Sequence, residues 1–359
     1  MSRENNAYGA VPGLPAFSIV VTCYNLEKYI REALDSCCKQ DYDGEWEVIV
    51  VDDCSTDNSR DIIRSYMAEH PEAPMRFLPR EQNGGVAAAT DTAVAAAKYD
   101  WIVMADGDDV QLPERLSKAA ITIQKHPDIK FLTMSRNSMS ADGTITGQQY
   151  YLVAADSNTL PPNELCKTSP EERMANMQAK HDKLANTGAS GLFHRDCYTR
   201  FGTLQGKSPH HLEQDPILMF RAMLLGPVMG TRDLACNYRN HATNLTNITL
   251  PGGVRGVMAF ERHQDKYLIL HTRTLHAELR DLEHAISHPD ITDWPPDLLD
   301  RARQHLLQEI AFCGTRAEWW KSSWWSRIAR AKRAGQLKSM VPRLLPFPIF
   351  CFLQYWRKR

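Results

Sequence analysis

Short apolar runs alternate with amphipathic segments through the first 135 residues of the chain. Phe17–Thr22, Glu47–Val51 and Trp101–Ala105 are rich in β-branched residues and predict buried strands. Met75–Leu78 is a weaker run of the same kind, and Phe131–Met134 closes the series. Near-continuous apolar strands separated by helices are typical of a mostly parallel sheet that is covered on both faces.

Apolar residues at helical spacing fill the gaps between these runs. They predict helices over Leu26–Cys38, Val86–Lys98 and Pro113–Lys125, and one that begins at the capping residue Asp57. Residues 136–185 are less regular, and no internal repeat is evident. The later part of the chain predicts an amphipathic piece over Pro170–Leu184, a small-residue turn into a strand over Asn186–Phe193, and helices over Glu213–Leu225, Phe260–His288 and Pro296–Phe312.

Polar turns follow four successive predicted strands. Because ligands bind at the carboxyl ends of the strands in such sheets, four turns on one edge predict a single polar site. The turns are Thr22–Asn25, Asp52–Asp57, Asn83–Gly85 and Asp106–Asp109.

The fourth turn, Asp106-Gly107-Asp108-Asp109, concentrates negative charge. Three carboxylates in four positions repel one another unless a cation neutralises them. Oxygen ligands at the end of a strand suit a hard divalent metal, which often also binds a diphosphate. The alternative is a solvated acidic turn that caps the helix beginning at Pro113.

The composition fits an ordinary globular protein of 359 residues, 43% hydrophobic and 24% charged. This length suggests one large domain with an appendage, or two modest domains. Nine scattered cysteines without a Cys-x-x-Cys pair argue against a disulfide framework and a structural zinc site, so a cytoplasmic location is expected. The first residues lack the apolar core of a signal peptide, and no stretch approaches the roughly 20 apolar residues that span a bilayer.

The last part of the chain, residues 316–359, is strongly basic. It has eleven Lys and Arg against the single acid Glu318, a net charge of +10, so the rest of the chain carries −11 within the overall −1. Indole rings favour the membrane interface and cations favour anionic headgroups, so this tail predicts a peripheral anchor at the cytoplasmic face of a membrane. A helix packed on the catalytic part is the alternative, and nothing supports nucleic-acid binding. The tail's tryptophans are Trp319, Trp320, Trp324, Trp325 and Trp356.

The motifs together resemble glycosyltransferase family 2, whose members have the nucleotide-sugar-binding α/β fold called GT-A. The resemblance runs from Phe17 to about Asn247. It implies a mostly parallel sheet flanked by helices and, in this chain, a helical C-terminal extension. The segments that carry it are FSIVVTCYN, VIVVDDCSTDNS, QNGGVAAATDTAVAAAKYDWIVMADGDD, TGASGLFHRD, EQDPILMFRAMLLG and YRNHATNLT.

The resemblance implies roles for individual residues on the donor side. Asp53, with Asp52 beside it, matches the acid that accepts a hydrogen bond from the base, a role that suits an acceptor-only carboxylate. The resemblance also implies that Asn83 and Gly85 take part in binding the nucleotide sugar. The residues that match the border of the base and ribose are Thr22, Tyr24, Asn25 and Glu27.

The acidic turn matches the metal and ribose cluster of the family. Asp108 is the expected Mg²⁺ or Mn²⁺ ligand, and Asp106 is expected nearer the ribose and sugar, with a share in the metal. Asp109 is the least defined of the three. The resemblance also makes His241 a candidate metal ligand and Arg239 a candidate phosphate contact. Gly107 stands where the family often has Ser, and both are small enough for a sharp turn.

Asp215 matches the general base of the family. A carboxylate can take the proton of an acceptor hydroxyl as its oxygen attacks the anomeric carbon, which gives inversion. The structural alternative is a plain N-cap before Pro216. Two departures accompany it: Gln214 replaces the usual Glu, and Ala89-Thr90-Asp91 replaces Ala-Arg-Asn. The second removes a cation expected near the nucleotide, so GDP or dTDP remain open beside UDP.

The resemblance implies a metal-dependent inverting glycosyltransferase acting on a glycan or lipid-linked acceptor in cell-surface polysaccharide synthesis. The alternatives are a nucleotidyltransferase, which would need a Gly-rich basic loop after the first strand, and a non-catalytic scaffold. The expected organisation is a flexible lead over residues 1–15, a catalytic domain over 16–250 divided at 135/136, a helical extension over 251–315 and the tail over 316–359.

Overall fold

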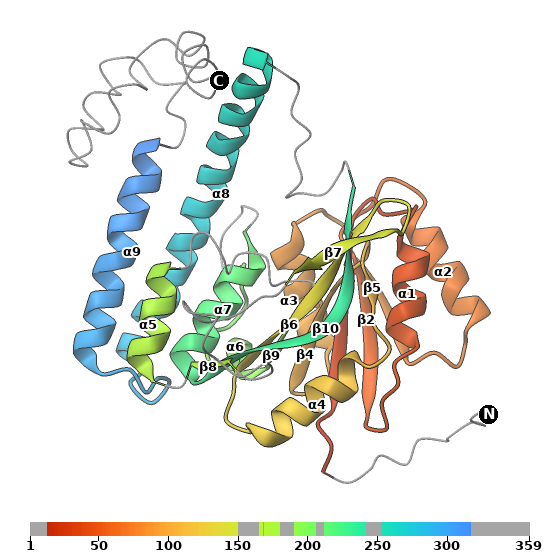
Figure 1. Ribbon diagram of the computed structural model, residues 1–359, viewed down its shortest axis with the longest axis horizontal. Coiled ribbons are helices and arrows are strands. Elements are labelled where there is room, and N and C mark those ends of the chain that lie inside the picture. Colours follow the sequence, from red (N-terminus) through yellow and green to blue (C-terminus); the bar gives the residue numbers. More distant parts are fainter. Residues whose placement is uncertain are drawn as a thin grey trace. The chain divides into compact units, whose positions relative to one another are not determined.

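The computed structural model describes most of the chain, and Figure 1 labels its elements. Two compact units are present, Met1–Asn240 with Asp281–Leu299, and His241–Arg280 with Asp300–Arg359. The four polar turns, Asp215 and Arg239 belong to the first unit, whereas His241 belongs to the second. The described residues are 13–149, 165–167, 169–179, 190–205, 212–241 and 253–316.

The first half of the sheet is parallel, as the apolar runs predicted. Its strands stand in the order β3-β2-β1-β4. Cys23 pairs with Asp52, and Thr22 pairs with Asp106, so three strands end at the same edge of the sheet. The strands are β1 (Phe17–Cys23), β2 (Trp46–Asp52), β3 (Met75–Pro79) and β4 (Trp101–Asp106).

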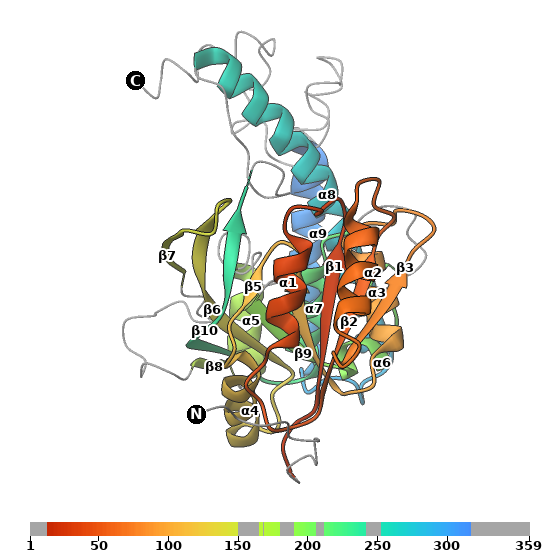
Figure 2. The same cartoon turned by 90° about the vertical axis from the view of Figure 1, so that its right-hand side faces the viewer.

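Helices cover both faces of this half. The Ala-rich α3 packs against β1 and β2, because its small buried side chains allow close approach, and α1 packs against α2. Figure 2 shows α1 and α2 toward the viewer. The helices are α1 (Ile30–Cys38), α2 (Ser59–Glu69), α3 (Val86–Ala96) and α4 (Arg115–Lys125).

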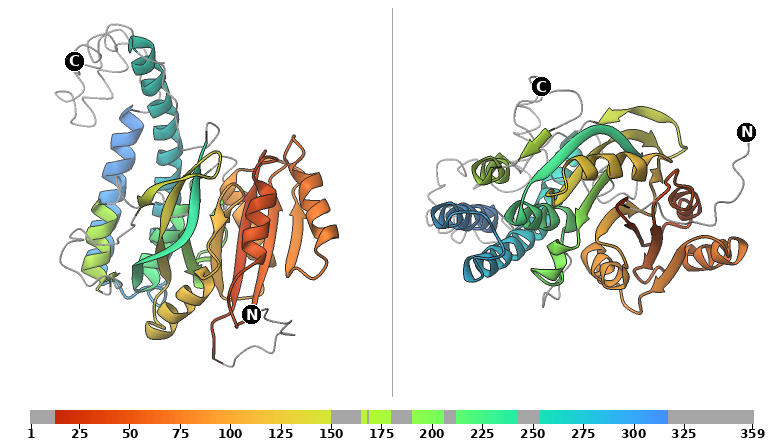
Figure 3. Two further views of the ribbon diagram at one scale, coloured as in Figure 1. Left: turned by 45° about the vertical axis from the view of Figure 1, so that its right-hand side comes forward. Right: turned by 90° about the horizontal axis from the view of Figure 1, so that it is seen from below.

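The second half of the sheet is mixed, so the expectation of a mostly parallel sheet holds only for the first four strands. β9 is antiparallel to both β4 and β6, while β10 is parallel to β6. Two register shifts interrupt the β10–β6 ladder, and β10 is visibly curved in Figure 3. The strands are β5 (Val110–Gln111), β6 (Phe131–Ser140), β7 (Ile145–Gln149), β8 (Leu165–Lys167), β9 (Gly191–His194) and β10 (Val228–Asn240).

Three helices accompany this half: α5 (Pro170–Ala179), α6 (Asp196–Thr199) and α7 (Gln214–Leu225). The helix α7 packs against α3, β6 and β9, and ten of its residues are buried. Its first turn contains Asp215, which lies close enough to the end of β4 for its charge to act on Asp106.

The last two described helices are α8 (Gly253–Ser287) and α9 (Pro296–Arg316). The connection between them belongs to the first unit, where the indole N–H of Trp294 donates to the carbonyl of Met223 at 2.9 Å. Among the described residues, no helix is long and apolar enough to cross a membrane. The predicted tail from residue 317 onward lies outside the described residues.

Candidate functional site

The four polar turns contact one another, as their placement on one sheet edge predicted. The Gly107 N–H donates to the carbonyl of Thr22 at 3.0 Å, and the Thr22 hydroxyl donates to Asp106 at 3.4 Å. The N–H of Asp53 donates to the carbonyl of Cys23 at 2.8 Å. The ends of β1, β2 and β4 are thus tied together through these turns.

The turn after β1 binds the turn after β2 through its own polar side chains. Asn25, at a positive φ of 55°, accepts the Thr56 N–H at 2.8 Å. The Glu27 carboxylate accepts from the backbone and side chain of Asn58 at 3.1 and 2.8 Å. These contacts delay α1 to Ile30, four residues after the predicted start. Tyr24, which directly precedes Asn25, is 47% exposed.

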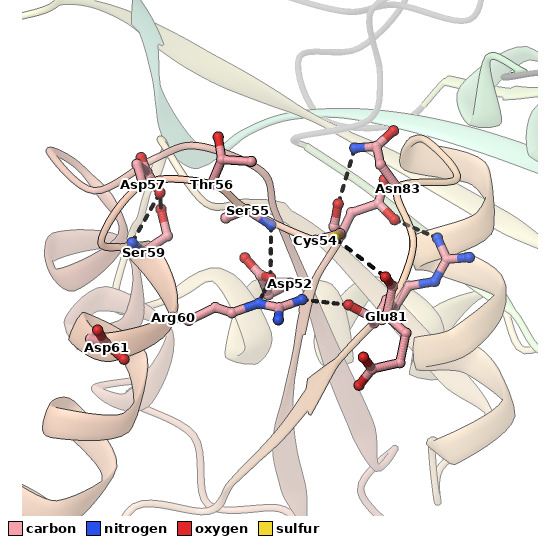
Figure 4. A network of polar contacts seen from close by, with 12 residues as sticks. Asp52, Cys54, Ser55, Thr56, Asp57, Ser59, Arg60, Asp61, Glu81 and Asn83 are labelled. Carbon is pink, nitrogen blue, oxygen red and sulfur yellow. Dashed lines mark hydrogen bonds and ion pairs between the residues drawn. The ribbon is translucent and has the colours of Figure 1, made fainter.

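Asp52, the last residue of β2, and Asp53 directly after it are buried and bind the loops around them. Asp52 accepts from the Ser55 N–H at 3.0 Å and from the Arg60 guanidinium, as Figure 4 shows. Asp53 accepts from the Arg80 guanidinium and from the N–H groups of Gly84 and Gly85, at 3.0 and 2.7 Å.

The amide of Asn83 completes this arrangement, since it donates to the carbonyl of Asp53 at 3.0 Å. A carboxylate offers about four acceptor positions, and the Asp53 carboxylate is used by three donor residues. The base-reading role of Asp52 and Asp53 stays a prediction, while their contacts to the loops are structural.

Gly107 occupies a place without room for a side chain. A Cβ there would lie 2.9 Å from the carbonyl oxygen of Thr22 and 3.0 Å from the side chains of Ile30 and Leu26. The sequence suggested that Gly and Ser are both small enough for this turn. The structure corrects that expectation, because the turn packs against β1 and α1 too closely for a β-carbon.

The acidic turn brings three carboxylates together. Ligand oxygens of Asp106, Asp108 and Asp109 all lie within 4.8 Å of one another. Burial, followed by the charges of Asp108 and Asp215, raises the pKa of Asp106 to about 7. Burial, followed by the charges of Asp108 and Asp106, raises the pKa of Asp109 well above its usual range. The cluster therefore carries repulsion that a cation would relieve.

These carboxylates fit a divalent metal ion. Asp109 is fully buried, and its Oδ1 accepts the backbone N–H of Arg239 at 2.8 Å. Its Oδ2 has no hydrogen-bond partner within the described part of the chain. A buried carboxylate oxygen without a donor, beside two more carboxylates, is a donor set that suits Mg²⁺ or Mn²⁺.

Arg239, near the end of β10, binds the acidic turn through its backbone and its side chain. Its guanidinium donates to the carbonyl of Asp108 at 2.9 Å and to the carboxylate of Glu32 at 2.6 Å, and it lies over the Tyr29 ring. The side chain is buried. Contact with phosphate stays a prediction, and the observed contacts make Arg239 a link between the acidic turn and α1.

Arg136 on β6 is a charged neighbour that sequence reasoning missed. It is buried, its guanidinium lies 3.8 Å from the centre of the Tyr238 ring, and its charge opposes the raised pKa values of Asp106 and Asp109. The sequence did hold a signal, because an Arg two residues beyond an apolar strand needs a partner for its charge if the strand continues into the core. The predicted strand ended too early to include it.

Asp215 lies in the first turn of α7. Its charge contributes to the raised pKa of Asp106, so the two carboxylates are electrostatic neighbours. The cap position of α7 is Glu213, so the alternative in which Asp215 is merely the N-cap is wrong. The role of Asp215 as general base stays a prediction.

The two departures from the family pattern meet each other in the structure. Thr90 is fully buried, and its hydroxyl donates to the side-chain oxygen of Gln214. Its neighbour Asp91 accepts the N–H groups of Leu204 and Gln205 at 2.7 and 2.9 Å. Position 90 thus points toward α7, and the expectation of a nucleotide-facing cation there lacks support from the contacts.

His241 is the first residue of the second unit and is buried. Its part in binding metal stays a prediction.

The comparison with protein families decides the assignment. A model described as glycosyl transferase family 2 matches residues 18–195. These residues belong to glycosyl transferase family 2. The match includes all four polar turns of the site and confirms the resemblance to this family. The structure confirms the α/β class expected from the sequence.

Curated relatives of this family 2 domain match its N-terminal part. The poly(ribitol-phosphate) beta-N-acetylglucosaminyltransferase TarS of Staphylococcus aureus is 38% identical over 112 residues, which are 31% of this chain and 19% of TarS. TuaG of Bacillus subtilis, described as a candidate teichuronic acid biosynthesis glycosyltransferase, is 31% identical over 130 residues, 36% of this chain and 50% of TuaG. The chain thus spans at most half of the length of these relatives.

Solved structures of the same kind align with most of the chain at low identity. A crystal structure of S. aureus TarS in complex with UDP-GlcNAc has a TM-score of 0.48 at 17% identity, covering 96% of this chain and 92% of that chain. The mannosyltransferase PcManGT from Pyrobaculum calidifontis, in complex with GDP-Man and Mn2+, has a TM-score of 0.47 at 17% identity, with coverages of 99% and 92%.

Proposed function

We propose that this protein is a metal-dependent, inverting glycosyltransferase that moves a sugar from a UDP-sugar to a hydroxyl group. The observation that carries the proposal is the cluster of Asp106, Asp108 and Asp109, whose ligand oxygens lie within 4.8 Å of one another. Asp215 is near enough for its charge to act on Asp106. A proton acceptor and a cation-binding cluster at one edge of a family 2 domain are the two parts that such a reaction needs.

In this mechanism Asp215 is the general base. Its carboxylate takes the proton of the acceptor hydroxyl as that oxygen attacks the anomeric carbon. The bond from that carbon to the diphosphate breaks on the opposite face, and the electron pair leaves with the nucleoside diphosphate. One displacement inverts the anomeric centre, and general-base assistance contributes about 10²–10⁴ in rate.

The acidic cluster supplies the cation site. Asp106, Asp108 and Asp109 would hold Mn²⁺ or Mg²⁺, which supplies charge that stabilises the departing diphosphate. The fully buried Asp109 accepts the Arg239 N–H with one oxygen, and its second oxygen has no hydrogen-bond partner among the described residues. The hydrogen bond from the Arg239 guanidinium to the Asp108 carbonyl fixes the backbone of the turn before a ligand binds.

The relatives suggest the class of acceptor. TarS is named for transfer to poly(ribitol-phosphate), and TuaG for teichuronic acid biosynthesis. We therefore propose a glycan or lipid-linked acceptor of a cell-surface polymer. The basic, tryptophan-rich residues 316–359 would bring the enzyme to the anionic surface where such acceptors are held, at the cytoplasmic face of the membrane.

The test is turnover of a panel of UDP-, GDP- and dTDP-sugars, followed as release of the nucleoside diphosphate with and without Mn²⁺. We expect slow hydrolysis of a UDP-sugar that requires Mn²⁺ or Mg²⁺ and stops with a chelator. Turnover that ignores the metal would overturn the metal-dependent mechanism. No turnover of any donor would favour a non-catalytic scaffold.

A further inference from the structure

The helix α3 connects the donor side of the site to the helix that carries Asp215. At its start, the N–H groups of Gly84 and Gly85 bind the Asp53 carboxylate, so the helix is anchored at the end of β2. Gly85, at a φ of +82°, is the residue from which the helix begins. Further along, α3 packs against α7.

The contact between the two helices includes a buried polar pair. Thr90 is 0% exposed and donates its hydroxyl hydrogen to the side-chain oxygen of Gln214, which is 5% exposed. Gln214 directly precedes Asp215 in the first turn of α7. A hydrogen bond away from water is directional and costly to leave unmade, so this pair fixes the rotation and height of that turn.

The rest of the α3–α7 contact is held independently of this pair. Asp91 on α3 accepts the N–H groups of Leu204 and Gln205. From α7, the buried guanidinium of Arg221 donates to the carbonyls of Gly202 and Thr203 at 2.7 and 3.1 Å. The segment 202–205 therefore joins the two helices, and removal of the Thr90–Gln214 bond leaves these contacts in place.

We propose that Thr90 and Gln214 are positioning residues that direct Asp215 toward Asp106. The inference rests on the proposed function, since it assigns the pair to the geometry of the proton transfer. Neither side chain is exposed enough to meet a substrate, so both act through Asp215. Their loss changes the rate of the chemical step and leaves donor binding, which depends on the anchored start of α3, unchanged.

Single variants test this first. In T90V and Q214M we expect the turnover number for the best donor of the panel to fall about tenfold, because a misplaced base slows proton transfer. The Kd for UDP with Mn²⁺, measured by calorimetry, should stay within about twofold of wild type. T90S should restore turnover. T92V is the matched control and should turn over like wild type. Within the described residues, the Thr92 hydroxyl donates to the Ala88 carbonyl of its own helix and to no other group.

The double variant T90V/Q214M separates positioning from stability. Each single variant leaves one buried polar group unpaired and should lower the Tm by about 3–8 °C, whereas the double variant removes both groups and should regain most of that loss. The proposal expects its turnover to stay about tenfold low. Turnover that recovers together with the Tm would show a purely structural pair and overturn the proposal.

Two other outcomes are equally decisive. Wild-type turnover in T90V would overturn the positioning role while leaving the proposed function intact. If the wild-type chain turns over no donor of the panel, the proposed function and this inference fall together.

Discussion

At the scale of single residues, the acidic turn combines mutual repulsion with a fixed backbone. Asp108 contributes to the raised pKa of both Asp106 and Asp109, and the turn is fastened to β1 and β10 by Gly107 and Arg239. Residue chemistry therefore leads to two separate expectations, one for the charge and one for the backbone.

The charge is tested by D108N. Without metal, the variant should have a Tm equal to or a few degrees above wild type, because a like charge is removed from the cluster. Its Mn²⁺ affinity should fall at least tenfold, so the metal-induced rise in Tm disappears. Differential scanning fluorimetry with a Mn²⁺ titration measures both. D61N, at an exposed surface carboxylate, is the control and should keep the wild-type metal response.

The backbone is tested by G107A. The added Cβ would lie 2.9 Å from the Thr22 carbonyl oxygen, so the turn must shift, and we expect a loss of about 1–3 kcal/mol in unfolding free energy. Urea unfolding measures it. G147A adds a methyl group where no atom lies within 4 Å and should change stability by less than about 0.5 kcal/mol. Equal effects in the two variants would contradict the close packing of the turn.

At the scale of elements, α7 is fixed by a buried ion pair as well as by α3. Arg221 donates to Asp281 at 2.6 Å, with side chains 0% and 1% exposed, and also to the carbonyl of Cys197 at 2.9 Å. These contacts of Arg221 are all to groups of the protein itself. Its expected contribution is therefore to the placement of α7.

R221M should destabilise the protein by about 3–5 kcal/mol, because it leaves Asp281 buried without a counter-charge. Chemical denaturation followed by circular dichroism gives the value. R200M removes an exposed Arg that lies 3.6 Å from Asp290 and should cost less than about 1 kcal/mol. A loss in R221M no larger than in R200M would sink the idea that the buried pair secures the helix.

Elements were predictable where one periodicity dominated. The strands from β1 to β4 and the helix α7 lie within a residue or two of their predicted positions. Burial on one or both faces gives these elements a regular spacing of apolar residues in the sequence. The predicted start of α1 was wrong. Side chains directly after β1 bind the loop that follows β2, and the helix begins only at Ile30. The strand β10 was missed because polar residues at the site interrupt its apolar pattern.

At the scale of the whole molecule, the sequence predicted the α/β class and the common edge of the four turns. It could not predict that the second half of the sheet is mixed, because pairing partners such as β9 with β4 and β6 are far apart in the chain. It also could not predict that Thr90 and Gln214, 124 positions apart, touch in the core. Tertiary contacts, rather than local pattern, decide such features.

The basic tail gives a prediction at this scale. The full chain should sediment with vesicles that contain phosphatidylglycerol, and raised salt should weaken the binding because cations meet anionic headgroups. Replacing the Lys and Arg residues from 316 to 359 by Gln should lower the affinity for these vesicles at least tenfold. Undiminished sedimentation of that variant would contradict the proposed anchor, and neutral phosphatidylcholine vesicles are the control.

The proposed mechanism requires that Asp215 and the acidic cluster form one reacting centre. The most direct measurement is the Mn²⁺-dependent release of nucleoside diphosphate by D215N, with UDP binding measured on the same preparation. We predict that turnover falls at least a hundredfold while the Kd for UDP with Mn²⁺ stays within about twofold, because the variant loses the proton acceptor and keeps the donor site. Turnover by D215N at the wild-type rate would contradict the account.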